Sequence, residues 1–252
     1  MRQTCVRILA IATLAGLLPA AAATTALAHD REPKRGQQKA KPADPKPLAP
    51  GGTYRGLTYG EWQARWWLET FATLEAQEDP FAIFKGAYGG SNDIVFLAGA
   101  IKQAESPKVK IPITVPSGAY LFVPIVTVEC SVAEGGEFHG ETEPELRACA
   151  NGLLDLVTGP YASIDGKPVK NAAAYRSDTP LFRYGPLAQG NVLMLPPGTQ
   201  SNAVGAGYFL LLPPLSPGDH RIVVRAEVPA VGYDVDAEFF IKVEAPKRKS
   251  RQ

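Results

Sequence analysis

The sequence predicts a mainly β fold, a jelly-roll-like β-sandwich with two short-to-medium helices. Many short apolar segments are separated by turn-forming residues, a pattern typical of β-sandwiches. The last two segments, 221–228 and 235–243, alternate between apolar and polar side chains as half-buried strands do. Two T-x-x-E sequences, which form capping boxes, mark where the helices begin.

Residues 1–28 are expected to form a cleavable signal peptide. Arg2 and Arg7 precede an apolar run over 8–18, and the small residues that signal peptidase recognises end at Ala28. The run is shorter than the roughly 20 apolar residues of a membrane-spanning helix, and no later segment is long and apolar enough. We therefore expect cleavage after Ala28, a secreted or periplasmic protein, and no transmembrane segment in the mature form.

The remaining chain is expected to form one domain between two basic ends. Residues 29–52 are a Pro- and Lys-rich linker and 246–252 a basic tail, and both have too few apolar residues to order. The domain, 53–245, carries 14 Lys and Arg against 22 Asp and Glu, a net charge of −8. The basic ends are solvated tails in the simpler interpretation, and they contact an anionic cell-surface ligand in the alternative.

Two cysteines remain after cleavage, Cys130 and Cys149. An isolated pair in an oxidising compartment most often forms a disulfide, which we expect here. A metal site or a catalytic thiol is the alternative.

The first helix is expected to begin after Thr58, because Thr58 and Glu61 form a capping box. This helix contains all three tryptophans of the chain. A second helix is expected over 143–157, where Thr142 and Glu145 form another capping box.

Most of the other apolar segments are predicted strands. They cover 94–98, 109–115, 120–128, 162–164, 167–169, 174–176, 191–195, 206–212, 221–228 and 235–243. Asp165 and Gly166 predict a two-residue hairpin turn. Pro124 lies inside an apolar strand and predicts a sheet edge or a bulge there.

Acidic residues gather between 129 and 145, where Glu129, Glu134, Glu137 and His139 are candidate binding residues. Carboxylates around a flexible loop can hold Ca²⁺, and a histidine admits Zn²⁺ or Mn²⁺. Glu134, Glu137 and His139 are therefore weak metal candidates, with a divalent cation as the ligand. The spacing fits no metal motif, so no cofactor is predicted. A solvated loop ahead of a helix N-terminus is the simpler interpretation.

Aromatic and basic side chains supply the other candidate binding residues. Trp66 and Trp67 would stack on the sugar rings of a glycan, although tryptophans at helical spacing more often form core. Tyr175 and Arg176 would hold an anionic ligand, although an ion pair with a nearby acid is as common. If Glu61 acted as an acid, its apolar neighbours would raise its pKa.

Several activities lack the motifs that they require. The chain has no G-x-S-x-G sequence, and His139 and His220 are the histidines of the domain that could act as bases. Phosphate loops and dinucleotide motifs are absent. The basic ends lack interleaved aromatic residues, so we expect no nucleic-acid partner.

Three parts of the domain resemble a family of uncharacterised secreted bacterial proteins. These are the Trp-rich helix of YGEWxARWW type at 59–67, the segment 115–124 with Glu129-Cys130, and 215–220. The resemblance spans most of 54–244. It implies an exported domain with a β-rich body, and it carries over no catalytic residue.

Taken together, these features predict an exported, disulfide-stabilised protein that is non-enzymatic and that binds a ligand or associates with a surface. A glycan or an anionic cell-surface ligand is the expected partner. The alternative is a carboxylate-dependent enzyme, a hydrolase or lyase that acts on an extracellular glycan, with a metal ion assisting in one version.

Overall fold

The computed structural model describes residues 46–73, 87–88, 93–98, 102–103 and 108–245. The predicted signal peptide, most of the predicted linker and the predicted basic tail lie outside the described residues. Within the described residues the chain is mainly strand and has two α-helices, which confirms the predicted fold class.

Both helices begin at their predicted capping boxes. Helix α1 spans Tyr59–Thr73 and helix α2 spans Glu143–Leu154. At α1, Thr58 N–H donates to Glu61 Oε2 at 2.8 Å, and Glu61 N–H donates to Thr58 Oγ1 at 3.3 Å. The corresponding reciprocal bonds are present at α2, which ends at Leu154 rather than at the predicted residue 157.

The strands form two larger sheets and a small hairpin. The first sheet contains, in spatial order, β10 (Arg176–Asp178), β12 (Ser201–Leu212), β7 (Tyr120–Ser131), β4 (Ile94–Leu97) and β3 (Ala87–Tyr88), with β11 (Phe182–Tyr184) also paired to β12. The second contains β5 (Lys102–Gln103), β14 (Tyr233–Val243), β13 (Gly218–Val228), β8 (Thr158–Ile164) and β9 (Lys167–Pro168), with β6 (Val109–Val115) also paired to β14. The hairpin pairs β1 (Thr53–Tyr54) with β2 (Leu57–Thr58).

The strand pairing does not establish the predicted jelly roll, because two of the strand pairs are parallel. Most pairs are antiparallel, but β4 pairs with β7 in parallel, and so does β6 with β14. A jelly roll is built from antiparallel strands. The prediction therefore holds at the level of a mainly β, sandwich-like arrangement.

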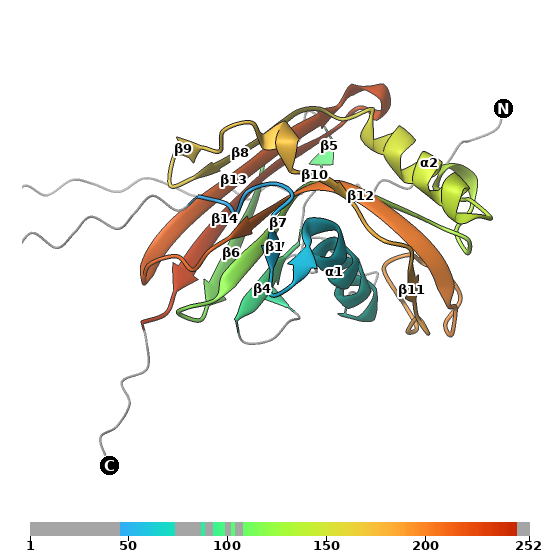
Figure 1. Ribbon diagram of the computed structural model, residues 1–252, viewed down its shortest axis with the longest axis horizontal. Helices are drawn as coiled ribbons and strands as arrows, with labels where there is room; N and C mark the ends of the chain where they lie inside the picture. Colours follow the sequence, from blue (N-terminus) through green and yellow to red (C-terminus); the bar gives the residue numbers. More distant parts are fainter. Residues whose placement is uncertain (1–45, 74–86, 89–92, 99–101, 104–107, 246–252) are drawn as a thin grey trace, which may run out of the picture.

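The core lies between the layers that these elements form (Figure 1). Helix α1 packs on the first sheet, where the ring centroids of Trp62 and Phe96 are 6.2 Å apart and those of Trp66 and Phe209 are 5.5 Å apart. Strand β7 also contacts β13 and β8, so one apolar cluster joins the two sheets. Helix α2 contacts β7 and β12.

Two local features follow from short sequence signals, as predicted. Strand β7 lies between two partners, and its register with β12 shifts between Tyr208 and Phe209, which lies opposite Pro124. Pro124 therefore sits at a bulge and not at an edge. Asp165 and Gly166 have φ values of 50° and 78°, the left-handed conformation that a type I′ hairpin turn requires at both positions.

Two of the predicted strands are wrong. Segment 174–176 falls mostly within the 3₁₀ helix Ala172–Tyr175, which leads into β10. Segment 191–195 forms no strand, because the amide of Asn191 donates to two loop carbonyl oxygens at 2.9 and 2.8 Å and closes a turn. A side-chain amide that closes a loop leaves no periodic pattern in the sequence.

Residues near the end of the predicted linker contact the domain. Leu48 packs against the core, and its N–H donates to the carbonyl oxygen of Leu211 at 2.8 Å. The Tyr59 hydroxyl donates to the carbonyl oxygen of Leu48 at 2.8 Å. Leu48, which the sequence places in the linker, thus makes contacts with residues far along the chain.

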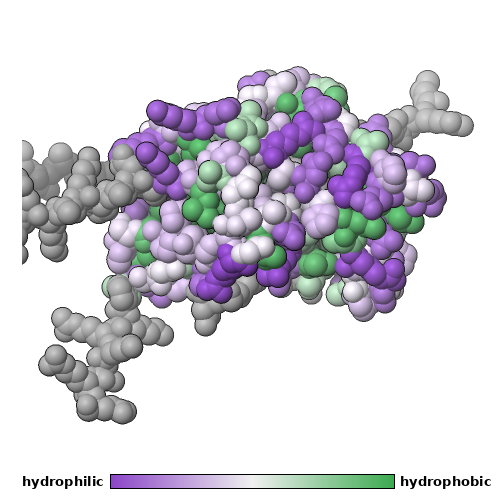
Figure 2. Space-filling model, viewed as in Figure 1, coloured by the Kyte–Doolittle hydropathy of each residue, from purple (hydrophilic) through white to green (hydrophobic). Residues whose placement is uncertain are grey.

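The described surface is mixed in polarity. Figure 2 shows hydrophilic residues over much of the viewed face, with apolar residues scattered among them. None of the helices in the described residues has both the length and the apolar character of a membrane span.

Candidate functional site

The end of β7 presents polar side chains to α1. Side chains alternate between the faces of a strand, so Thr127, Glu129 and Ser131 share one face and Cys130 takes the other. Gln63 of α1 donates from Nε2 to Thr127 Oγ1 at 3.2 Å, which identifies the first face as the one that α1 covers.

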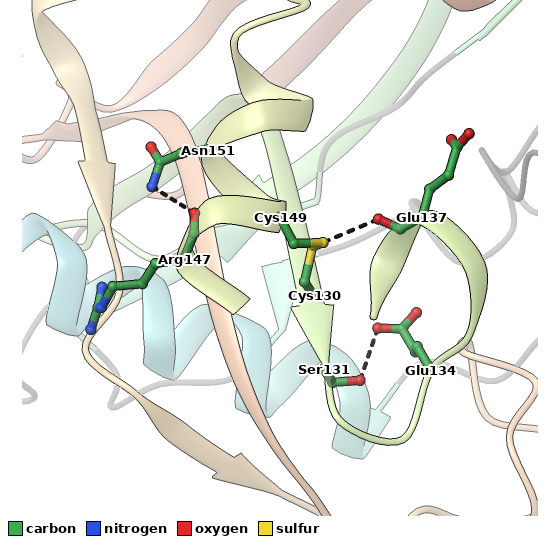
Figure 3. Close-up of a disulfide and its surroundings, with 7 residues drawn as sticks. All are labelled: Cys130, Ser131, Glu134, Glu137, Arg147, Cys149 and Asn151. Carbon is green, nitrogen blue, oxygen red and sulfur yellow. Dashed lines mark hydrogen bonds between the residues drawn. A yellow bond between two sulfur atoms is a disulfide. The ribbon is translucent and has the colours of Figure 1, made fainter. Parts of the chain in front are cut away.

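The predicted disulfide between Cys130 and Cys149 is present and joins β7 to α2, with a Cα–Cα distance of 6.2 Å (Figure 3). Cys149 Sγ also lies 3.1 Å from the carbonyl oxygen of Glu137. A disulfide sulfur carries no hydrogen, so this approach is a contact and not a hydrogen bond. The bridge anchors the strand end that carries Glu129.

Glu129 and Glu134 form an acid pair at this strand end. Glu129 is only 5% exposed, whereas Glu134 is half-buried. Burial raises the pKa of Glu129 well above its usual value, and the charge of Glu134 and a side-chain hydrogen bond with Glu134 raise it further. We therefore assign the shared proton to Glu129 and the negative charge to Glu134.

A chain of hydroxyl groups supports the Glu134 carboxylate. Ser131 Oγ donates to Glu134 Oε2 at 2.9 Å (Figure 3) and lies 2.9 Å from the Tyr184 hydroxyl. Because the proton of Ser131 points to Glu134, Tyr184 is the donor in the second bond. Burial raises the pKa of Tyr184 to about 12, so Tyr184 keeps its proton.

Two buried polar atoms beside this pair have no hydrogen-bond partner among the described residues: Glu129 Oε1 and Trp67 Nε1. Gly205 of β12 lies opposite Glu129 in the strand register. A Cβ at Gly205 would lie 2.5 Å from Trp67 Nε1, so the glycine is what admits the indole ring here. A buried polar group without a partner costs about 1–3 kcal/mol. Two such groups at one place therefore identify the candidate site.

The other acidic-loop candidates do not join this pair. The carboxylate of exposed Glu137 points away from Glu134 in Figure 3. The ring of His139 pairs through Nε2 with Glu141 Oε1 at 3.0 Å, and its Nδ1 is buried without a partner in the described structure. Within the described ranges, no group of three or more His, Cys, Asp and Glu side chains could hold a metal ion.

Trp66, Trp67 and Glu61 all make contacts within the fold. Trp66 is 4% exposed and donates from Nε1 to the carbonyl oxygen of Leu97 at 2.7 Å, so it belongs to the core. Trp67 is half-buried and packs edge-on against Trp66, at 4.8 Å between centroids. Hydrogen bonds from Thr58 lower the pKa of Glu61, which agrees with the capping interpretation and not with an acid of raised pKa.

Tyr175 and Arg176 lie apart from the acid pair in their contacts. Arg176 donates to Asp155 Oδ1 at 2.6 Å and to Asn151 Oδ1 at 2.7 Å, both at the end of α2. Tyr175 is buried against Tyr59, with 6.0 Å between ring centroids. These contacts favour the structural interpretation, with Asp155 as the acid that pairs with the arginine.

One further group resembles a nucleophile–base–acid arrangement. Ser216 Oγ lies 3.3 Å from His220 Nε2, and His220 Nδ1 lies 2.7 Å from Asp165 Oδ2. However, His220 Nε2 also lies 2.8 Å from the carbonyl oxygen of Ser216, an acceptor that takes the hydrogen of that nitrogen. Pro217, which follows the serine, has no N–H to stabilise an oxyanion. The group therefore joins two turns and does not activate a nucleophile.

Sequence reasoning identified Glu129, Glu134 and Trp67 separately but missed Ser131, Tyr184 and Gly205. Glycine inside an apolar strand indicates close approach of another group, and Gly205 is such a glycine. The glycine would have predicted a close contact at position 205, but not that Trp67 makes it.

No protein-family model matches the chain, and no curated protein matches it. A solved structure of PbICP-C in complex with falcipain-2 is 12% identical, with a TM-score of 0.23, and covers 60% of this chain and 99% of that chain. The solution structure of Amebosin is 11% identical, with a TM-score of 0.18, and covers 55% and 100%. TM-scores this low support no inference about fold or function.

Proposed function

We propose that the chain is an exported, disulfide-stabilised protein that binds a ligand beside Glu129 and Trp67 without transforming it. The observation that carries this proposal is that two buried atoms, Glu129 Oε1 and Trp67 Nε1, find no hydrogen-bond partner in the described part of the chain. Buried polar groups are nearly always hydrogen-bonded, and exceptions concentrate at functional sites. A glycan is the ligand class that we propose.

Export to the periplasm or beyond is part of the same proposal. The Cys130–Cys149 disulfide supports it, because disulfides persist mainly in oxidising compartments. The Trp-rich helix supports membership of the family of secreted bacterial proteins described above. The basic ends, which would contact an anionic cell surface, lie outside the described residues.

The spacing of the two carboxyl groups argues against the enzyme alternative. Glycoside hydrolases with two catalytic carboxyl groups hold them about 5–9.5 Å apart, which leaves room for the scissile bond. Glu129 and Glu134 are close enough for a side-chain hydrogen bond, so the sugar has no room between them. The raised pKa of Glu129 follows from burial and from this contact.

Binding and turnover can be measured on the same samples. We expect the mature chain, 29–252, to bind at least one of labelled maltoheptaose, cellohexaose and chitohexaose and to release no new reducing ends. Trp67→Phe removes the N–H and keeps a ring, so it should weaken binding about tenfold, the loss of about one hydrogen bond. Glu137→Gln, at an exposed position in the same loop, is the control and should bind as wild type does.

Three results would reject the proposal. Absence of binding to all three oligosaccharides would reject a glycan as the ligand. Equal binding by the Trp67→Phe variant would show that the ligand does not bind beside Trp67. New reducing ends that disappear in Glu129→Gln would establish the enzyme alternative.

A further inference from the structure

We propose that a single hydroxyl-type oxygen binds between Trp67 Nε1 and Glu129 Oε1 and joins them. This inference rests on the proposed function and names the chemistry that the site recognises: a neutral group that donates one hydrogen bond and accepts another.

The position of the site follows from the strand register. Directly opposite residues of an antiparallel pair have their Cβ positions about 4.5–5.5 Å apart on the same face. Glu129 and Gly205 are such a pair, and Trp67 Nε1 lies 2.5 Å from where a Cβ of Gly205 would be. The Glu129 side chain and Trp67 Nε1 therefore stand on the same face at neighbouring positions of the sheet, and neither polar atom has a hydrogen-bond partner among the described residues.

The chemistry of the site follows from the two atoms. An indole N–H can only donate. Glu129 gives its proton to the contact with Glu134, so Oε1 is left as an acceptor. A hydroxyl oxygen accepts from Trp67 and donates to Glu129 at the same time. It satisfies both atoms with one group.

Charged ligands fit the surroundings less well. An ammonium group would meet the positive N–H edge of Trp67, and an anion would meet the carboxylate of Glu134. The titratable groups that face Glu129 are Glu134, on the segment after β7, and Tyr184, on β11. The neighbouring elements α1 and β12 contribute uncharged Trp67 and Gly205.

Water and an alcohol group of a bound glycan share this chemistry. A water molecule is the simplest occupant, because buried waters commonly join polar groups that lack other partners. A sugar hydroxyl would replace that water with the same two hydrogen bonds.

Indole N–H resonances of the ¹⁵N-labelled mature chain test the proposal, because the chain has three tryptophans. Trp62 and Trp66 are internal controls, since their Nε1 atoms donate to protein carbonyl oxygens at 3.1 and 2.7 Å. We expect a cross-peak to a bound oxygen's proton from the Trp67 indole and none from the other two. The Trp67→Phe variant assigns the resonance by its loss.

Two variants of Glu129 test the acceptor. Glu129→Gln retains an acceptor oxygen and should keep the cross-peak, whereas Glu129→Met removes that oxygen and should abolish it. Persistence of the cross-peak in a folded Glu129→Met variant would overturn the proposal. If that variant does not fold, a missing cross-peak in the wild-type protein would overturn it equally.

Addition of whichever of the three oligosaccharides binds the mature chain distinguishes the two sources. Transfer of the Trp67 cross-peak from water to sugar protons would identify a ligand hydroxyl. A water cross-peak that saturating sugar leaves unchanged would keep the proposed oxygen site and reject ligand binding at it, so the two proposals can fail separately.

Discussion

Replacing Glu129 with glutamine should change how stability depends on pH. Glu129 is 5% exposed and its pKa is raised, so the folded protein keeps a proton that the unfolded chain releases above about pH 4.3. The folded state therefore loses stability as pH rises from that value until Glu129 ionises. The loss is about 1.4 kcal/mol per pH unit for one proton. Glutamine has no such proton. The free energy of unfolding of Glu129→Gln, relative to that of the wild type, should therefore increase at that rate as pH rises.

Urea unfolding at pH 5, 6 and 7, followed by circular dichroism with the disulfide intact, measures the difference. Glu137→Gln is the matched control, because Glu137 lies in the same segment and is exposed. Its unfolding free energies should parallel those of the wild type. Parallel curves for the wild type and Glu129→Gln would refute the assignment of the buried proton to Glu129.

Three further changes should alter the free energy of unfolding, measured with urea. Reducing the Cys130–Cys149 disulfide, with a sequence separation of 19, should remove about 3 kcal/mol. Gly205→Ala should cost about 1–3 kcal/mol, because its Cβ would lie 2.5 Å from an indole nitrogen. Arg221 and a lysine lower the pKa of Glu238 to about 2. The wild type should therefore lose about 1.4 kcal/mol of stability per pH unit as pH falls from about 4.3 towards 2. Glu238→Gln should lack this loss.

The two substitutions among these changes have matched controls. For Gly205→Ala the control is Gly152→Ala, a glycine of α2 whose added Cβ meets nothing within 4 Å, which should stabilise by about 0.5–1 kcal/mol. For Glu238, which is 3% exposed, the control is exposed Glu227. An equal effect of the two glycine substitutions, or acid curves that are unchanged in Glu238→Gln, would contradict these predictions. If a reductant leaves the urea midpoint of the wild type unchanged, the predicted contribution of the disulfide is contradicted.

Local patterns accounted for most of the elements. Capping boxes located both helix starts, and Asp165-Gly166 and Pro124 predicted a turn and a bulge that are present. These features depend on residues within a few positions of one another. The strand predicted at 191–195 was wrong because Asn191 closes that loop through its side chain.

The sequence by itself determined the fold class, the helix starts and the cysteine pair, because propensity, capping and the scarcity of cysteine act locally or by composition. It also singled out Glu129, Glu134 and Trp67, but for different reasons and as members of separate sites. Only the tertiary structure decided that Glu129 lies opposite Gly205 and that Trp67 packs over Gly205, since these placements need the register of β7 with β12 and the packing of α1 on the sheet. Burial at that point, which no local pattern encodes, raises the pKa of Glu129 and leaves two polar atoms without partners among the residues that the structure describes.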